Sequence, residues 1–402
     1  MMRGAFGQPW GPRRGGCEGC GTMQWPKRIL RDGAARRSFA ALLVTAAFFS
    51  PQVLSPAWAQ PTPIDLSTHP VHWNPESRSD TEAGELEWAG EIELSSTHKR
   101  FGGWSGLAIS ADGSTLLAIS DEATWLTGQL LYDEKGRLSG MGDAKIAPLL
   151  GSDGKPLTGK YLADAEGLTV DGPDPLKANA YVSFERQHRV LRYNLGKDGF
   201  EAKAEQIISE RQLGKLNTNA GLEALTILKQ KPGIKETRLL LVSENSRDPR
   251  GNVRAFIAEG NKLKRLSFRL HDPYHPTDVA RLPNGDFLLL ERRFSLLAGA
   301  GMQLRLIRED AVRPGAVADG NVLLDVGQRR SIDNMEGLAV RQDEKGNVWI
   351  YAISDDNFNP LQRTLLVMFR LKPETLTPPH SLGKDGSLGA KTLSAPTESK
   401  PK

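Results

Sequence analysis

The 402-residue chain contains only two cysteines, Cys17 and Cys20, and both precede the expected cleavage site described below. A C-x-x-C pair can bind metal or carry redox chemistry in a folded domain, but the predicted mature protein has no cysteine. It therefore has no disulfide, thiol nucleophile or thiolate metal site. Zinc is also disfavoured, because His188, His271 and His275 do not fall into a tight ligand spacing.

The sequence has no G-x-S-x-G motif, which serine hydrolases place on a strand–turn–helix. The segment from Gly103 to Gly106, GWSG, matches only in part and has no such context. Ser105 occupies a position that holds an acid in related segments, so we interpret it as a capping serine rather than a nucleophile.

No apolar run is long enough to span a bilayer, which needs about 20 apolar residues. The run from Ala40 to Phe49 follows Arg36-Arg37-Ser38-Phe39 and precedes Ala57-Trp58-Ala59. This order is typical of an export signal, so we expect cleavage after Ala59 and a periplasmic or secreted protein. The paired arginines resemble a twin-arginine signal, and an ordinary signal peptide with incidental arginines is the alternative.

The positive net charge of +4 comes from this leader, residues 1–59, which hold eight basic and two acidic residues. The remaining 44 basic and 46 acidic residues give no reason to expect nucleic-acid binding. With 41 Gly and 25 Pro, the composition favours a turn-rich β protein. We expect a linker or wrapped arm at 60–86, a folded domain at 87–372 and a disordered tail at 373–402.

A β-hairpin pattern recurs five times in the folded part, with short apolar strands and acids at the open ends. Equivalent positions recur every 55 to 61 residues, which leaves room for four short strands in each repeat. We aligned the repeats at Gly106, Gly167, Glu223, Asp278 and Gly337.

This regularity predicts an all-β fold, a β-propeller of five four-stranded blades, with six as the alternative if two blades are merged. The last repeat lacks a fourth strand, and residues 90–95 form an isolated strand before the first repeat. We expect that N-terminal strand to close the ring. A β-sandwich or a stack of unrelated hairpins is the competing interpretation.

In a propeller, residues before the first strand and after the second strand of each blade lie on one face near the axis. A dozen carboxylates occupy such positions: Asp121, Glu122, Asp164, Glu166, Glu185, Glu223, Glu244, Asp278, Glu291, Glu336, Asp355 and Asp356. Carboxylates this close repel one another unless cations compensate them. Arg186 and Arg292 could pair with some, and Ca²⁺, which takes six to eight oxygen ligands, could bind others. The alternative is that each acid caps a turn.

Several segments resemble the bacterial phytase-like family, also described by the esterase-like activity of phytase. They are AEGLTV at 165–170, MEGLAV at 335–340, SGLAIS at 105–110, SDDNFN at 354–359 and HPTDVARLPNGDFLLLERRF at 275–294. The resemblance covers about residues 88–372. It implies an exported propeller that hydrolyses phosphate esters or other esters.

Our sequence-based hypothesis is therefore a monomeric, exported hydrolase of small phosphoric esters that uses calcium. The predicted catalytic residues are Glu166, Glu223, Glu336, Arg186 and Arg292. The predicted metal ligands are Asp121, Glu166, Glu223, Glu244, Asp278, Glu291, Glu336 and Asp355. A metal-dependent lactonase or carboxylesterase and a non-catalytic ligand-binding or protein-binding propeller are the alternatives.

Overall fold

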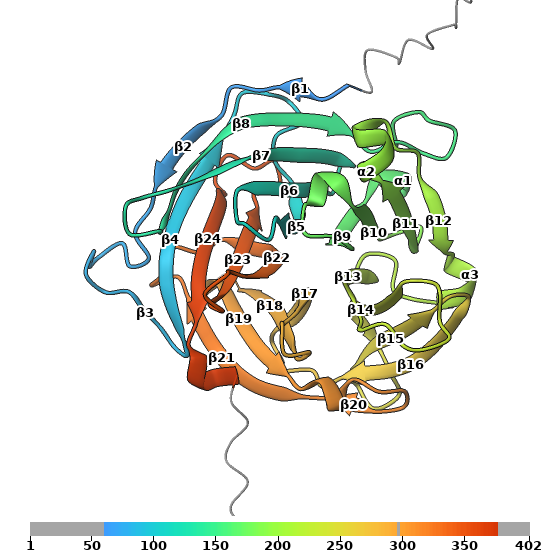
Figure 1. Cartoon of the computed structure of the whole chain (residues 1–402). Helices are drawn as coiled ribbons and strands as arrows, with labels where there is room; N and C mark the ends of the chain where they lie inside the picture. The colour runs from blue at the N-terminus through green and yellow to red at the C-terminus, as the bar shows by residue number, and fades with distance from the viewer. Residues whose placement is uncertain (1–59, 296–297, 377–402) are drawn as a thin grey trace, which may run out of the picture. The chain divides into compact units, whose positions relative to one another are not determined.

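A computed structural model describes residues 60–295 and 298–376, so the predicted leader and most of the predicted tail lie outside the described residues. Strands dominate this part of the chain, and the sheets are arranged around a common centre (Figure 1). The predicted all-β, propeller-like fold is confirmed. Among the described helices, none has the length and apolar character required to cross a membrane.

Most strands belong to groups of four in which each strand pairs antiparallel with the next along the chain. The first group is β5 (Trp104–Ile109), β6 (Thr115–Ser120), β7 (Thr124–Tyr132) and β8 (Leu138–Pro148). The second is β9 (Ala165–Val170), β10 (Asn179–Phe184), β11 (Arg189–Asn194) and β12 (Glu205–Ile208). The third is β13 (Leu222–Ile227), β14 (Arg238–Arg247), β15 (Val253–Glu259) and β16 (Lys262–Phe268). The fourth is β17 (His275–Arg281), β18 (Phe287–Ser295), β19 (Gly299–Ile307) and β21 (Gly320–Gly327).

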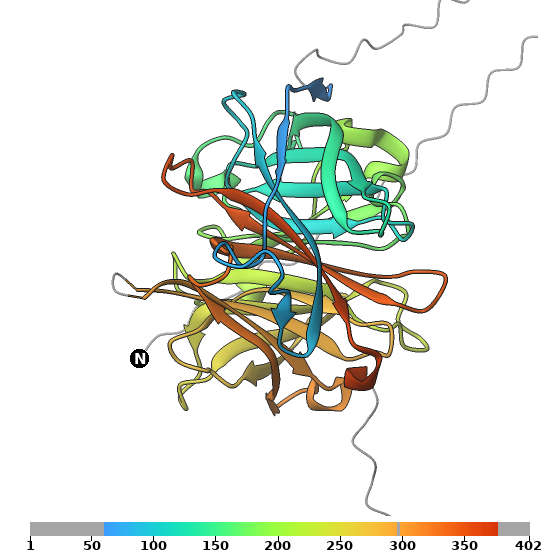
Figure 2. The same ribbon diagram turned by 90° about the vertical axis from the view of Figure 1, so that its left-hand side faces the viewer.

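The last group takes its outer strand from the other end of the described chain. It contains β22 (Asn334–Gln342), β23 (Val348–Asp355), β24 (Thr364–Leu371) and β4 (Leu86–Ser95). β4 pairs antiparallel with β24, from Leu94 opposite Thr364 to Leu86 opposite Leu371 (Figures 1 and 2). The predicted closing strand is therefore confirmed and begins four residues earlier than expected. Its pairing covers an edge of β24 that would otherwise be open to other chains.

The first strands of the five groups lie nearest the centre (Figure 1). β5 contacts β9, β9 contacts β13, β13 contacts β17, β17 contacts β22, and β22 contacts β5. These contacts form a closed cycle. All five strands begin at the same end of this cycle, and we call that end the mouth.

Shorter elements cover the outside of the sheets. They are β1 (Thr62–Pro63), β2 (Ser67–Pro70), β3 (Glu82–Ala83), β20 (Val317–Ala318), α1 (Lys160–Ala163), α2 (Leu195–Asp198), α3 (Glu210–Leu213), and the 3-10 turns η2 (Pro175–Lys177), η3 (Gly199–Glu201), η4 (Glu309–Ala311) and η5 (Pro373–Leu376). β1 pairs with β8, and β2 and β3 pair with β4. The segment 60–86 thus runs along the outer strands as an arm. η5 contains the first four residues of the predicted tail.

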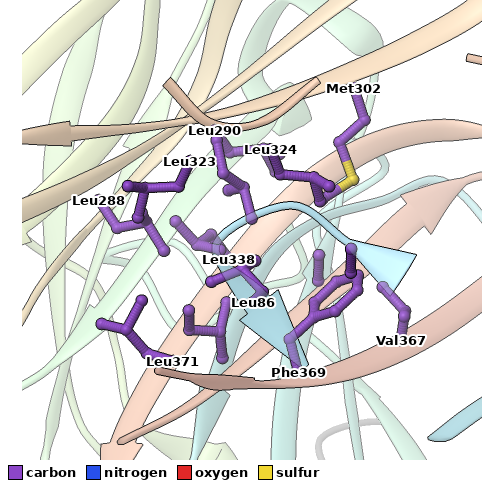
Figure 3. Packing of buried hydrophobic residues seen from close by; sticks show 14 of the residues in the cluster. Leu86, Leu288, Leu290, Met302, Leu323, Leu324, Leu338, Val367, Phe369 and Leu371 are labelled. Carbon is purple, nitrogen blue, oxygen red and sulfur yellow. The ribbon is translucent and has the colours of Figure 1, made fainter. Parts of the chain in front are cut away.

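Aliphatic side chains fill the layers between neighbouring sheets and hold the inner strands in place. In the cluster of Figure 3, Leu288 and Leu290 of β18 lie near Leu338 of β22 and Phe369 of β24. Each of these side chains is at most 2% exposed. Burying one such side chain contributes about 1.5–3 kcal/mol, so the sheets act as rigid supports for the loops at the mouth.

Gly90 allows β4 to touch β8, and its replacement by alanine should destabilise the fold. Gly90 pairs with Leu138 in a parallel bridge. Its φ is +116°, and an added Cβ would lie 2.4 Å from the carbonyl oxygen of Leu138. We expect Gly90→Ala to lower the free energy of unfolding by about 2 kcal/mol or more, because both the clash and the strained backbone cost energy. Chemical denaturation measures this loss. Gly142→Ala is the control, because its Cβ would meet nothing within 4 Å; equal losses would contradict the prediction.

Candidate metal and active site

Each innermost strand carries a β-bulge close to the mouth. In every pairing of a first strand with a second strand, the register shifts by one residue near the start of the first strand. A bulge leaves its extra residue outside the ladder and turns that side chain to a new direction. The bulged residues are Ser105, Glu166, Glu223, Thr277 and Glu336.

This register corrects our alignment of the repeats. The residue after the bulge is Gly106, Gly167, Ala224, Asp278 or Gly337, so the alignment of Glu223 with the glycines was wrong by one position. Glu223 is instead equivalent to Glu166 and Glu336. The glycines have a packing reason: a Cβ on Gly167 would lie 2.4 Å from the backbone oxygen of Glu223. The structure therefore places three of the predicted catalytic residues at equivalent positions.

The ends of the second strands supply a further ring of equivalent residues. They are Asp121, Glu185, Glu244, Arg292 and Asp355. Each directly follows the second-strand residue that pairs with the residue before the bulge. In the fourth sheet that ring position holds Arg292, and Glu291 is the residue before it. Successive side chains of a strand point to opposite faces, so Glu291 and Arg292 face different surroundings.

Glu291 and Asp278, two of the predicted metal ligands, have other partners. The Arg305 guanidinium donates to both carboxylate oxygens of Glu291, at 2.9 and 2.7 Å, and both side chains are fully buried. Asp278 accepts the N–H groups of Val279 and Leu338, each at 2.8 Å. Asp278 follows the bulge rather than occupying it, so its carboxylate holds two inner strands together. The structure does not bring either residue to the glutamates at the bulges.

Five other acids do come together, in two groups that share one member. Carboxylate oxygens of Asp164, Glu166 and Glu185 lie within 4.8 Å of one another, and so do those of Glu185, Glu223 and Glu244. We call these five residues the carboxylate cluster. The common member, Glu185, is held in place because its Oε1 accepts the N–H of Gly221 at 2.8 Å. Asp164 and Glu185 belonged to the predicted ring but not to the chosen ligands.

Among the residues that the structure describes, cationic side chains compensate the acids only at the edges of this cluster. Arg186 and Lys160 contact Asp164 at 2.6 and 2.7 Å, and Lys160 also bonds Asp121. On the other side, Arg292 lies 3.3 Å from Glu244 and 3.2 Å from Glu336. Lys160 was not predicted. Its spacing of four residues before Asp164, across the single turn of α1, is a signal that could have identified it.

Glu166 lies between these cations without a partner of its own. Its side chain has no hydrogen bond or ion pair within the described part of the chain, although the residue is only 9% exposed. Burial, followed by the charges of Glu223 and Glu336, raises the pKa of Glu166 well above its ordinary value. Burial and the neighbouring Glu244 and Glu185 raise the pKa of Glu223 in the same way. An uncompensated carboxylate at such a position is costly without a cation.

Two more acids at the mouth titrate near neutral pH. Burial raises the pKa of Glu185 to about 7, against the opposing hydrogen bond from Gly221. Burial and the charge of Glu336 raise the pKa of Asp355 to about 8. Since a metal ion favours ionised ligands, a cation bound here would return such groups to their charged form.

The donor set fits a hard divalent cation. All five members of the carboxylate cluster offer oxygen, and Asn334, whose amide donates to Glu336 at 2.8 Å, adds a neutral oxygen nearby. Calcium and magnesium prefer such ligands, and calcium accepts the larger and less regular set. The described residues at the cluster include no histidine or cysteine, so zinc is not favoured.

A cavity of about 590 Å³ lies at the opposite end of the inner strands. Apolar residues such as Ile109, Val170 and Ile227 line it together with Arg281 and Arg341. It contains one acid, Asp171, which already bonds the amide and backbone N–H of Asn179. Groups whose pKa is shifted by burial and by neighbouring charges mark candidate reactive sites, and the mouth gathers several of them, so the mouth is the stronger candidate.

Comparison with known proteins agrees with the repeat motifs. The sequence model of the phytase-like family, described as esterase-like activity of phytase, matches residues 99–358. The search of curated proteins found no match. Among solved structures, a protein of unknown function from Dyadobacter fermentans shares 10% identity, with 78% of this chain and 96% of that chain covered and a TM-score of 0.38. A putative oxidoreductase (glucose dehydrogenase) from Thermus thermophilus shares 15% identity, with 76% of this chain and 100% of that chain covered and a TM-score of 0.31. Scores this low support no further argument.

Opposite effects on stability are expected from neutralising Glu166 and Glu291. Glu166→Gln removes an uncompensated buried charge and should raise the free energy of unfolding of the metal-free protein by roughly 1 kcal/mol. Glu291→Gln leaves the buried Arg305 with less counter-charge and should lower the free energy of unfolding by about 2 kcal/mol or more. Denaturation in EDTA at pH 8 measures both. Destabilisation by Glu166→Gln would indicate a structural role instead.

The stability of the metal-free protein should fall as the pH rises from about 5 to about 8. The folded-state pKa values of Glu185 and Asp355 lie above their ordinary values, so the folded protein binds more protons than the unfolded chain in this range. The stabilisation that these two carboxyl groups contribute is complete below their pKa in the unfolded chain. It is lost as the pH rises through their pKa in the folded protein. Thermal melting in EDTA at several pH values measures this slope. Asp355→Asn should flatten it, and an unchanged slope in that variant would exclude Asp355 as a source.

Proposed function

Because this chain belongs to the phytase-like family, we propose that it hydrolyses phosphoric esters with a divalent metal ion held at the mouth. The observation that supports this proposal most is Glu166, an almost buried acid with no cationic partner among the described residues, within 4.8 Å of other carboxylates. Without a bound cation, this arrangement would lower the stability of the protein and serve no function. We interpret the closed cycle of five first strands as five blades around the site.

We propose the carboxylate cluster as the metal centre, with Asp121, Glu336 and Asp355 beside it. Glu166, Glu223 and Glu244 were predicted as ligands, and the geometry adds Asp164 and Glu185. Calcium is the ion we favour, because it accepts six to eight oxygen ligands with flexible geometry. When bound, such a cation polarises a phosphoryl oxygen and lowers the pKa of a coordinated water.

Arg292 and Arg186 would bind and orient the phosphate. The Arg292 side chain is 31% exposed and contacts its two glutamates at more than 3 Å, so part of its guanidinium can face a ligand. Arg186 is similarly exposed, at 32%, and is held by Asp164. Guanidinium groups form paired hydrogen bonds with phosphate oxygens. A glutamate that is raised in pKa, such as Glu223, is suited to accept a proton from the attacking water.

The same site supports a second candidate, hydrolysis of carboxylic esters, because the matched family is described by an esterase-like activity. In that case a metal ion would polarise the carbonyl oxygen, and Arg292 would stabilise the negative charge that develops on it. Export by the N-terminal leader to the periplasm and a monomeric state complete the proposal, as the sequence predicts.

Substrate and metal dependence can be tested with the purified protein. We expect phosphate release from phosphomonoesters with added calcium, and loss of that activity in EDTA. Glu223→Gln should lower kcat about 100-fold or more, whereas Glu291→Gln, which removes an acid outside the cluster, should retain most activity per folded molecule. Colorimetric phosphate detection and calcium titration measure both effects.

Turnover of aryl esters or lactones without phosphate release would select the carboxylic-ester candidate. Binding of calcium and phosphate with no turnover of either substrate class would exclude both hydrolase proposals. Absence of calcium binding would exclude the proposed metal centre itself.

A further inference from the structure

A second cavity, away from the mouth, has the opposite charge. It measures about 570 Å³ and is lined by residues of β15, β16 and β20 on the outer part of the third sheet. Figure 1 shows these strands in the lower part of the view. Its lining includes four basic residues, Lys215, Arg250, Arg254 and Arg265. None of the acids at the mouth belongs to its lining. We call it the outer basic cavity.

These four cations lack ionic partners within the described part of the chain. Within the same described residues, the charged groups of these four side chains make one hydrogen bond, of 3.0 Å, from Arg254 Nη1 to the backbone oxygen of Lys215. Other arginines of the sheets are paired, as Arg238 is with Glu259 at 2.8 Å and Arg192 is with Glu205. Four uncompensated cations around one cavity create a local positive potential.

The single acid in the lining, Asp248, is already engaged. Its Oδ2 accepts from the Ser267 hydroxyl at 2.7 Å. Its Oδ1 accepts the N–H groups of Arg250 and Asn252 at 2.8 and 3.0 Å. Asp248 therefore serves to shape the loop between β14 and β15, which presents Arg250 to the cavity. The cavity retains four basic side chains against one acid.

The floor of the outer basic cavity is apolar. Leu213, Phe256 and Leu266 line it and are 2%, 2% and 4% exposed. Its volume lies within the range of small-molecule sites, about 300–1,000 Å³. An apolar floor with cationic walls suits a compact anion that carries a small organic group, because guanidinium forks bind oxyanions in pairs of hydrogen bonds.

We propose that the outer basic cavity binds a small phosphate-bearing anion. Arg250 and Arg265, both exposed and without other partners in the described chain, would contact the phosphate oxygens, and Arg254 and Lys215 would add to the field. This site is separate from the proposed metal centre and does not depend on the hydrolase proposal. Its lining is positively charged, so it needs no metal ion to attract an anion.

Isothermal titration calorimetry of the full chain with pyrophosphate and with phenyl phosphate tests the proposal. EDTA is present throughout, so that the carboxylate cluster holds no metal and repels anions. We expect saturable binding at one site that weakens with added salt. Tighter binding of phenyl phosphate would assign the site to organic phosphates, and tighter binding of pyrophosphate would assign it to inorganic polyphosphates.

Arg250→Gln with Arg265→Gln should weaken this binding about tenfold or more. The matched control is Lys229→Gln with Lys235→Gln, which removes the same charge from two exposed lysines between β13 and β14. Melting temperatures of both double variants establish that they fold. Absence of saturable binding by the wild type, or equal weakening in the control, would overturn the proposal.

Discussion

The repulsion among buried and half-buried carboxylates is the constraint on which the mouth of this protein depends. Asp164, Glu166, Glu185, Glu223 and Glu244 lie in two overlapping groups, and their oxygens approach within 4.8 Å. Like charges at such distances raise one another's pKa or require cations. Lys160 and Arg186 on one side and Arg292 on the other supply some compensation, but they reach only the edges. The rigid sheets hold the centre together against this repulsion.

The β-bulges explain how the sheets impose that crowding. A regular ladder would alternate the side chains of each first strand between two faces, and the bulged glutamates would point into the layers between sheets. The extra residue breaks this alternation at one place in every inner strand. Glycine after the bulge then allows the neighbouring backbone to approach, as the contact between Gly167 and the oxygen of Glu223 shows. A small irregularity, repeated around the cycle, thus positions three glutamates alike.

The sequence predicted the fold well because the repeats are long-range regularities that survive local variation. The strand that closes the cycle, the face that collects the acids and the equivalence of Glu166 with Glu336 were all predictable from strand lengths and spacing. The register of individual residues was not predictable in this way. Glu223 was placed one position off, because a bulge shifts the register without changing the apolar pattern. Glu291 was chosen because it is the first acid after the apolar run of β18, but it occupies the position of Ser120 and Ser243, and Arg292 follows it in the ring. The partners of Asp278 and the contacts of Lys160 depend on neighbouring sheets, which a hairpin pattern does not specify.

The closing strand also has a consequence for how the chain reaches this fold. Glu87 of β4 and Arg370 of β24 form a hydrogen-bonded ion pair across 283 residues. During synthesis β4 emerges before the other strands of the five groups, and β24 emerges after them. Contacts this distant in sequence form slowly, because much of the chain must be ordered before they are made. The pairing of β4 with β24 therefore completes the cycle of sheets only after all the strands between them have been translated.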